Sequence, residues 1–322
     1  MQLITDNTMR LLENRFINKE LWNRSVENSS FPTIFADYDI LTLASPGWKA
    51  LVLGEYEYVM PLPTKAKLGV KYVYTPFFMS QLGIFSKNEI TPEVTMLFFN
   101  SIPYIYRQID LLLAPGNYSD NSLINPIEMH TYQMRLNRPY VLLEQRFSEN
   151  TKRNIKAAEK AGLTYTTQLS VGEVIGLFKN GRGKDKSIRY NKKDYRLLEE
   201  MAGCASKKGM LDIVGVRDDE GRLLAGALFL RDYQCIRFWF SGRDYRFPEK
   251  KAMFFLLNEY LKVNEKQDLL FDFNGSMNEN VARFYKGFGG EQCSFPFVNL
   301  RRYSYLSPFI KMYKTIIKQE KS

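Results

Sequence analysis

The chain has 322 residues, of which 45% are hydrophobic and 25% charged, and it carries a formal net charge of +10. This composition excludes a disordered chain, and the length suits two domains of about 150 residues each. The positive charge favours an anionic partner, such as CoA, a nucleotide-linked precursor, tRNA or an acidic membrane surface, without choosing among them.

In chain order, the first half is predicted to contain a polar helical segment, a hairpin, an aromatic strand, a helix and a buried strand: residues 1–30, 48–63, 72–86, 91–103 and 107–115. The hairpin turns about Gly54. The helix is opened by Thr91 and Pro92, which suit a helix N-terminus.

A basic helix is predicted between the halves, at residues 146–163, with Ser148 as N-cap and Gly162 at its C-terminal end. Its lysines and arginine either meet an anionic substrate or are simply solvated. The glycine- and lysine-rich residues 180–195 predict a surface loop or a lid, followed by a helix at 195–209.

The second half is predicted to contain a hairpin, an aromatic strand, an apolar helix and an inner strand: residues 211–230, 235–242, 248–264 and 269–273. This order matches that of the first half with an offset of roughly 160 residues, which indicates a divergent internal repeat.

The turn after the strand 235–242 is strongly basic, with Arg243, Arg246, Lys250 and Lys251. Pro248 suits the first position of the helix that follows. A helix N-terminus with these cations forms an anion site, because its free backbone N–H groups and the helix dipole attract phosphate. The alternative is a solvated basic turn. Asp272 ends the next strand, at the edge where ligands of open α/β sheets bind.

The cysteines and the single histidine restrict the chemistry. Cys204, Cys235 and Cys293 are far apart, which favours a reducing, cytoplasmic setting over a disulfide framework or a zinc site. A histidine-rich metal centre is excluded, and we expect no metal. His130 is expected in a strand. No stretch approaches the ~18 apolar residues of a membrane span.

The sequence NENVARFYKGFGG at residues 278–290 resembles the last helix of the GNAT N-acyltransferase superfamily. The resemblance implies that Asn278 contacts the pantetheine arm of the acyl donor and that Tyr285 protonates the departing thiolate. Together with DFNGS at 272–276, the stretch also resembles the Fem-type peptidyltransferases and their acyltransferase relatives, which contain two GNAT-like domains.

Two positions depart from these families. Fem enzymes usually have a Phe-Lys pair, with the lysine implicated in aminoacyl transfer, where this chain has Phe284 and Tyr285. GNAT enzymes that use acyl-CoA usually have a glycine-containing pyrophosphate loop, whereas RFPEKKA at 246–252 has no glycine. Pyrophosphate would therefore approach residues that carry side chains, with lysines replacing some backbone contacts.

The resemblance and the repeat together imply an α/β fold of two tandem GNAT-like domains, with mixed, mainly antiparallel sheets flanked by helices. We expect an N-terminal domain at 1–145, a C-terminal domain with the donor site at 146–303, and a helical tail at 304–322. The tail is basic and amphipathic. It either packs on the protein or makes peripheral membrane contact.

The leading hypothesis is an N-acyltransferase that carries an acyl group from acetyl-CoA or another acyl-CoA to a primary amine. Backbone N–H groups near Ser241 and Gly242 would hold the donor carbonyl, and Tyr285 would act as general acid. Asp272 is the candidate base, or else a structural cap on the turn after it. The alternative for Tyr285 is a core aromatic residue of its helix, which the Asn-to-Tyr spacing disfavours.

Two alternatives remain at this stage. One is a Fem-like transferase that takes an amino acid from aminoacyl-tRNA to a cell-wall precursor. The other is a non-catalytic protein of the same fold that binds a nucleotide, nucleic acid or envelope precursor. The acceptor amine, on a small molecule or in the cell envelope, has no signature in the sequence.

Overall fold

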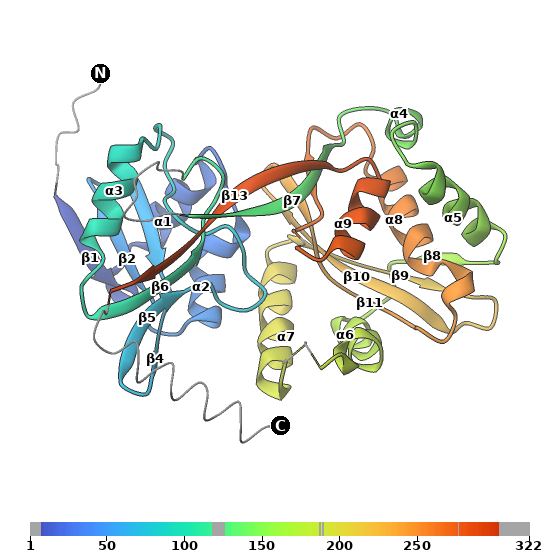
Figure 1. Cartoon of the computed structure of the whole chain (residues 1–322), viewed down its shortest axis with the longest axis horizontal. Coiled ribbons are helices and arrows are strands. Elements are labelled where there is room, and N and C mark those ends of the chain that lie inside the picture. The colour runs from blue at the N-terminus through green and yellow to red at the C-terminus, as the bar shows by residue number, and fades with distance from the viewer. Residues whose placement is uncertain (1–7, 118–125, 187, 189, 276, 303–322) are drawn as a thin grey trace.

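The computed structural model describes residues 8–117, 126–186, 188, 190–275 and 277–302 (Figure 1). Its strands form a three-stranded sheet, in the order β1-β2-β3, and a ten-stranded sheet, in the order β4-β5-β6-β13-β7-β12-β11-β10-β9-β8. The predicted tail at 304–322 lies outside the described residues. In the part of the chain that is described, no helix has the length and apolar character needed to span a bilayer.

The first half contains seven strands and four α-helices within its described part: β1 (Met9–Glu13), α1 (Lys19–Glu27), α2 (Tyr38–Ala44), β2 (Lys49–Leu53), β3 (Tyr58–Leu62), β4 (Thr64–Lys67), β5 (Val70–Tyr74), α3 (Pro92–Ser101), β6 (Tyr106–Leu112), β7 (Ile127–Arg135) and α4 (Tyr140–Glu144). Two single turns, η1 (Asn14–Phe16) and η2 (Ile34–Ala36), lie among them.

The second half contains α5 (Glu149–Glu159), β8 (Thr164–Thr166), α6 (Val171–Asn180), η3 (Arg182–Lys184), α7 (Lys192–Lys207), β9 (Leu211–Arg217), β10 (Leu223–Asp232), β11 (Cys235–Arg243), η4 (Pro248–Lys250), α8 (Ala252–Val263), β12 (Leu270–Asp272), α9 (Glu279–Gly287) and β13 (Glu291–Arg301).

The predicted repeat is visible in the topology. In each half a strand, a helix and a second strand follow one another, and the two strands pair in parallel: β5–α3–β6 in the first half and β11–α8–β12 in the second. The other pairs between named strands are antiparallel. The fold is therefore the expected tandem α/β arrangement with mixed, mainly antiparallel sheets.

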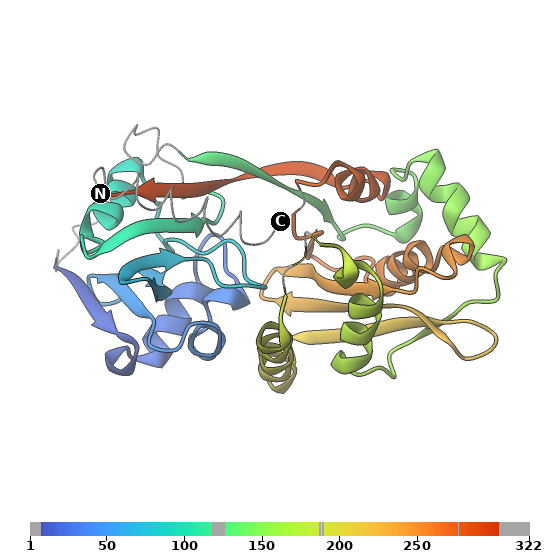
Figure 2. The same cartoon turned by 60° about the horizontal axis from the view of Figure 1, so that its bottom comes forward.

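Two long strands join the halves into one sheet. The first part of β13 pairs with β7, from Glu291↔Gln133 to Phe297↔Ile127, and its last part pairs with β6, as far as Arg301↔Gln108. At its other end β7 pairs with β12. Figure 2 shows β13 extending from the second half across to the first. The division between residues 145 and 146 stays a prediction.

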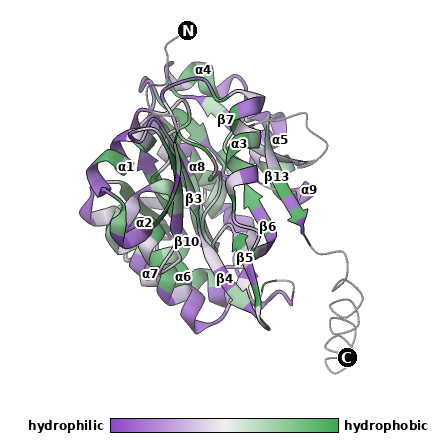
Figure 3. Cartoon of the chain, turned by 90° about the vertical axis from the view of Figure 1, so that its left-hand side faces the viewer, coloured by the Kyte–Doolittle hydropathy of each residue, from purple (hydrophilic) through white to green (hydrophobic). Residues whose placement is uncertain are grey.

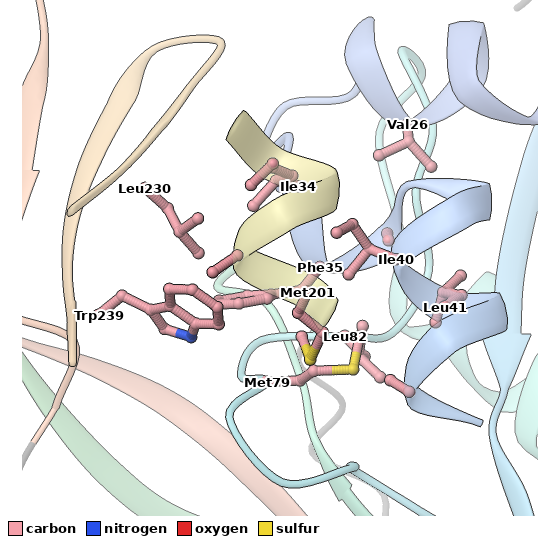
Figure 4. Packing of buried hydrophobic residues seen from close by; sticks show 14 of the residues in the cluster. Val26, Ile34, Phe35, Ile40, Leu41, Met79, Leu82, Met201, Leu230 and Trp239 are labelled. Atoms are coloured by element: carbon pink, nitrogen blue, oxygen red, sulfur yellow. The ribbon is translucent and has the colours of Figure 1, made fainter. Parts of the chain in front are cut away.

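Three hydrophobic clusters stabilise this arrangement. One lies among α5, α8, α9 and the strands of the second half and includes Tyr132 and Met134 of β7. Another lies around Phe98 and Phe99 of α3 and includes Val298 of β13. The third contains residues of both halves: Ile34, Phe35 and Leu82 lie beside Met201, Leu230 and Trp239 (Figure 4). In Figure 3, hydrophilic residues of α1 and α2 lie at the outer edge of the molecule.

Most predicted elements are confirmed, and three need correction. Residues 1–30 are not all helical, because Met9–Glu13 form β1, the edge strand beside β2. The strand predicted over 72–86 ends at Tyr74, and the chain then continues as a loop with left-handed Phe78 and Gln81. Pro248 opens only the single turn η4, and α8 starts at Ala252 after the left-handed Lys251.

Candidate active site

The candidate site lies where β11 and β12 separate. The two strands pair at only three positions, the last of which is Arg237↔Asp272. There β12 ends, and the chain turns away through Asn274 and Gly275, which have positive φ angles of 59° and 75°. Because β11 continues to Arg243, it has one edge without a neighbouring strand beside a gap.

Tyr285 of α9 lies beside this gap, at 9% exposure. Its ring stacks on Phe273, with centroids 4.8 Å apart, and meets the edges of Phe238 and Tyr132, each at 6.2 Å. Burial raises the pKa of the Tyr285 hydroxyl, although the guanidinium of Arg182 acts in the opposite direction. The hydroxyl therefore stays protonated at neutral pH, as a proton donor requires.

Arg182 was not identified as a site residue from the sequence. It lies in η3, within the basic segment 180–195 that predicted a loop or lid. The segment rests on the end of β11, since a Cβ added to Gly181 would lie 2.9 Å from the carbonyl oxygen of Arg243. The sequence signal for this position was the pair Gly181 and Gly183 on either side of Arg182, because glycines allow a backbone to approach a neighbouring segment closely.

Asp272 is fully buried and surrounded by donors. One oxygen accepts hydrogen bonds from the Thr131 hydroxyl and the backbone N–H of Asn274, the latter at 2.7 Å. The other accepts from Gln133 at 3.0 Å and from Arg237 at 3.3 Å. The bond to Asn274 is the turn cap that the sequence left open as an alternative to a catalytic base. Both carboxylate oxygens are engaged.

Arg237 connects this point to the first half. Its guanidinium, 5% exposed, donates to Asp232 at 3.2 Å, to Gln81 at 3.0 Å and to the carbonyl oxygen of Pro32 at 3.4 Å. Asp232 also accepts from the backbone N–H of Ile34 at 2.8 Å. An ion network therefore joins both halves at the position where β11 and β12 separate.

Ser241 and Gly242 lie on the free part of β11. Ser241 is partly buried, whereas Gly242 is buried beneath α6. A Cβ on Gly242 would lie 2.4 Å from the backbone nitrogen of Phe178 and 2.8 Å from the carbonyl oxygen of Val174. The glycine therefore allows α6 to pack directly on the strand, a requirement that the sequence reading did not anticipate.

The predicted basic cluster is divided in the structure. Arg246 forms a two-bonded ion pair with Asp244, at 3.0 and 2.7 Å, and Lys250 lies 3.7 Å from Asp219. Arg243 packs on Tyr245, and Lys251 precedes α8 without capping its first turn by a side chain. Within the described ranges, Arg243 and Lys251 have no carboxylate partner.

Asn278 occupies the N-cap of α9, as the sequence predicted for the start of this helix. Its side-chain oxygen accepts from the backbone N–H groups of Asn280 and Val281, at 3.1 and 3.3 Å. Asn278 thus follows the turn after β12 and orients the helix that carries Tyr285. His130 lies in β7, as expected, 3.4 Å from the hydroxyl of Ser294.

Comparison with known proteins gives one family match. Residues 145–285 match the model of the Acetyltransferase (GNAT) domain family. Among curated proteins, none matches the chain. The matched segment begins before α5 and ends at Tyr285, so it includes the gap between β11 and β12.

Several solved structures resemble the whole chain. FemX has 12% identity, with a TM-score of 0.65 over 90% of this chain and 97% of that one. The C-terminal domain of a putative lysylphosphatidylglycerol synthetase from Agrobacterium fabrum has 10% identity, with a TM-score of 0.55 over 92% and 96%. L-PGS from Bacillus licheniformis has 13% identity, with a TM-score of 0.53 over 95% and 98%. At these identities the likeness concerns the fold.

Proposed function

We propose that this chain, whose residues 145–285 match the GNAT acetyltransferase domain model and whose fold is similar to that of FemX, moves an acyl group from an acyl-CoA-type thioester to a primary amine. The observation that carries this proposal is the gap between β11 and β12, with Tyr285 beside it. A strand edge without a neighbour offers backbone N–H and C=O groups to an extended, amide-containing donor.

The donor phosphates are proposed to bind where β11 leads into α8. Arg243 and Lys251 supply cations there that have no carboxylate partner among the described residues, and the first turn of α8 lacks a side-chain cap. Free backbone N–H groups at a helix N-terminus favour phosphate. Lysine and arginine side chains thus replace the glycine-rich loop that the sequence lacks. Asn278, at the start of α9, is the proposed contact for the pantetheine arm.

The proposed reaction forms a C–N bond and breaks the C–S bond of the thioester. Tyr285 donates its proton to the leaving thiolate, because its raised pKa lies well above that of a thiol. Arg182, whose charge acts on the Tyr285 hydroxyl, is the proposed cation that stabilises the negative charge developing as the C–S bond breaks. Backbone N–H groups near Ser241 and Gly242 are the proposed donors to the thioester carbonyl.

Asp272 fits a positioning role better than that of a base. Its oxygens are all hydrogen-bonded, and its partners Arg237, Thr131 and Gln133 come from the strands on either side of β12. The first proton of the attacking ammonium is therefore proposed to leave to solvent before the amine attacks. The second proton, which the nitrogen loses as the C–N bond forms, passes through solvent and restores the Tyr285 hydroxyl. Asp272 holds the strand ends at the distance that the donor needs.

The first test is the melting temperature of the purified protein with acetyl-CoA, longer acyl-CoAs, desulfo-CoA and bulk tRNA, at two salt concentrations. We expect CoA species to raise Tm at both salt concentrations, because a bound ligand stabilises the native state. Arg243→Gln together with Lys251→Gln should abolish the increase, and Arg246→Gln should retain it. No response to any CoA species would refute the thioester donor.

The catalytic role of Tyr285 has a separate test. Tyr285→Phe keeps the ring contacts and removes the hydroxyl, and should lower kcat by about 10²–10⁴-fold, the range of one general acid. Tyr132→Phe is the matched control, because its ring also borders Tyr285. Equal effects of both substitutions would contradict the role of Tyr285.

A second candidate is transfer of an aminoacyl group from tRNA to an amine or lipid of the cell envelope. Its support is the whole-chain likeness to FemX and to L-PGS, together with the net charge of +10. The aromatic Tyr285 at the position of the Fem lysine argues against it. A Tm response to tRNA that salt abolishes, without any response to CoA, would favour this donor.

A further inference from the structure

A groove of 430 Å³ lies on the first half, apart from the gap at Tyr285. It is lined by Tyr74, Thr75, Asp110, Leu112, Met129 and Phe297. Thr75 directly follows β5, and the other residues lie in β5, β6, β7 and β13, whose registers place Tyr74 opposite Asp110 and Leu112 opposite Phe297. The volume is within the range of small-molecule sites, about 300–1,000 Å³.

The lining is mainly apolar, with one unpartnered hydroxyl. The Tyr74 hydroxyl is buried and has no hydrogen-bond partner within the described residues. Burial of such a group without a partner is unfavourable, and native proteins rarely leave it so. The hydroxyl is covered in this structure, so a ligand group would supply the missing bond after a neighbouring side chain, such as the exposed Lys65 over the Tyr74 ring, moves aside. Leu112, Met129 and Phe297 would meanwhile contact an apolar body.

The charge at the groove is positive rather than negative. The Asp110 carboxylate is occupied, since it accepts from Asn299 at 2.9 Å, from Arg301 at 2.7 Å and from Gln108. It is therefore not available to a ligand amine. Lys65 of β4 lies with Nζ 4.7 Å from the centre of the Tyr74 ring. It has no carboxylate partner among the residues that the structure describes.

We propose that this groove is a second binding site, which takes an amphipathic anion with an aliphatic body and a carboxylate or phosphate head. The aliphatic body lies on Leu112, Met129 and Phe297. The head accepts a hydrogen bond from Tyr74 and lies beside the ammonium of Lys65. The hydroxyl of a tyrosine is a good donor to an ionised oxygen, and such bonds are stronger than neutral ones.

The proposal is independent of the donor site. It uses side chains of strands of the first half and of β13 where that strand crosses onto the first half, whereas the proposed acyl donor binds on β11 and α8. If the groove does not bind the anion, the proposed acyl transfer is unaffected. If CoA species do not bind on β11 and α8, the groove proposal is likewise unaffected.

The experiment titrates the full chain by calorimetry with three probes of equal length: octanoate, octanol and octylamine. Octanoate should bind with a Kd near or below about 1 mM, and at least about tenfold more tightly than octylamine, because only the carboxylate pairs with Tyr74 and Lys65. Acetyl-CoA at saturation should not change the octanoate affinity. No saturable octanoate binding, or octylamine binding as tightly, would overturn the proposal.

Three single substitutions locate the site. Tyr74→Phe should weaken octanoate binding by about tenfold, the effect of a hydrogen bond to a charged group. Lys65→Gln should weaken it by about fivefold, since exposed ion pairs contribute less. Lys71→Gln, on the same hairpin and exposed, is the control for lost charge and should have no effect. Equal effects of Lys65→Gln and Lys71→Gln, or none from Tyr74→Phe, would refute the site.

Discussion

Substitution of Arg237 by methionine tests the buried network that joins the halves. Methionine keeps much of the aliphatic volume but removes the charge, so Asp232 and Asp272, at 1% and 0% exposure, become buried carboxylates without their cation. Loss of one partner of a buried ion pair costs about 3–5 kcal/mol. Gln81 and the Pro32 carbonyl lose their donor as well. We expect a decrease in the free energy of unfolding within that range.

The loss should depend on pH. Burial raises the pKa of Asp232, and Arg237 opposes that rise. In Arg237→Met the opposing cation is gone, so the native pKa rises further above the unfolded value of about 3.9. Between the unfolded pKa and the raised native pKa, the Asp232 carboxyl binds more protons in the native state than in the unfolded state. The free energy of unfolding therefore falls as pH rises through that range. The decrease in stability should therefore be larger at about pH 8 than at about pH 5.

Urea unfolding followed by circular dichroism measures both effects. Arg217→Met is the matched control, because Arg217 pairs with Glu173 at the surface, with side-chain exposures of 35% and 43%. Such pairs contribute about 0–1 kcal/mol. If Arg237→Met cost no more than Arg217→Met, or lost more stability at low pH than at high pH, the reasoning would be wrong.

Three further outcomes follow from local geometry. Gly242→Ala should destabilise by about 1–3 kcal/mol in thermal melts, because its Cβ would lie 2.4 Å from a backbone nitrogen of α6. Gly203→Ala, in α7, should raise Tm instead, because an added Cβ would have no atom within 4 Å and alanine favours a helix. A lower Tm for Gly203→Ala than for Gly242→Ala would contradict the close packing at Gly242. Ser148→Ala should cost about 1 kcal/mol as the N-cap of α5, and Ser148→Asp should restore most of it. Because burial raises the pKa of Tyr285, its hydroxyl should stay protonated, and kcat should not fall through Tyr285 ionisation below about pH 10. A fall of kcat near neutral pH that Tyr285→Phe abolishes would show that the hydroxyl ionises there and would refute this protonation state.

Local signals in the sequence predicted local structure well. Ser148 is an N-cap in the structure, as expected, α9 follows Asn278 within the stretch predicted as a helix, and the hairpin around Gly54 connects β2 and β3. Capping and turn formation depend on a few neighbouring residues, so one sequence contains the information. The repeated strand, helix and strand were found for the same reason.

Features that depend on distant residues were missed. Nothing in the sequence of β13 shows that its second part pairs with β6, because strand pairing is decided by contacts far apart in the chain. Arg182, whose charge acts on the Tyr285 hydroxyl, follows α6, and the packing of α6 on Gly242 has no signal in the sequence of either segment. Asp272 was identified as a site residue from the sequence. That both of its carboxylate oxygens accept hydrogen bonds could not be predicted, because the donors Thr131, Gln133 and Arg237 lie on β7 and β11.

The family match covers residues 145–285, yet the site inside that segment is completed by the first half. The backbone carbonyl of Phe78 accepts from the Trp239 indole at 2.7 Å, and the Ser80 hydroxyl donates to Asn274 at 3.0 Å. Gln81, on the same loop, contacts Arg237. These three contacts hold β11, and the turn that leaves β12, on either side of the gap. Because β12 also pairs with β7, the width of the proposed donor site is set by residues outside the matched segment. The loop after β5, which the sequence predicted as part of a strand, therefore forms one border of the proposed donor site in the second half.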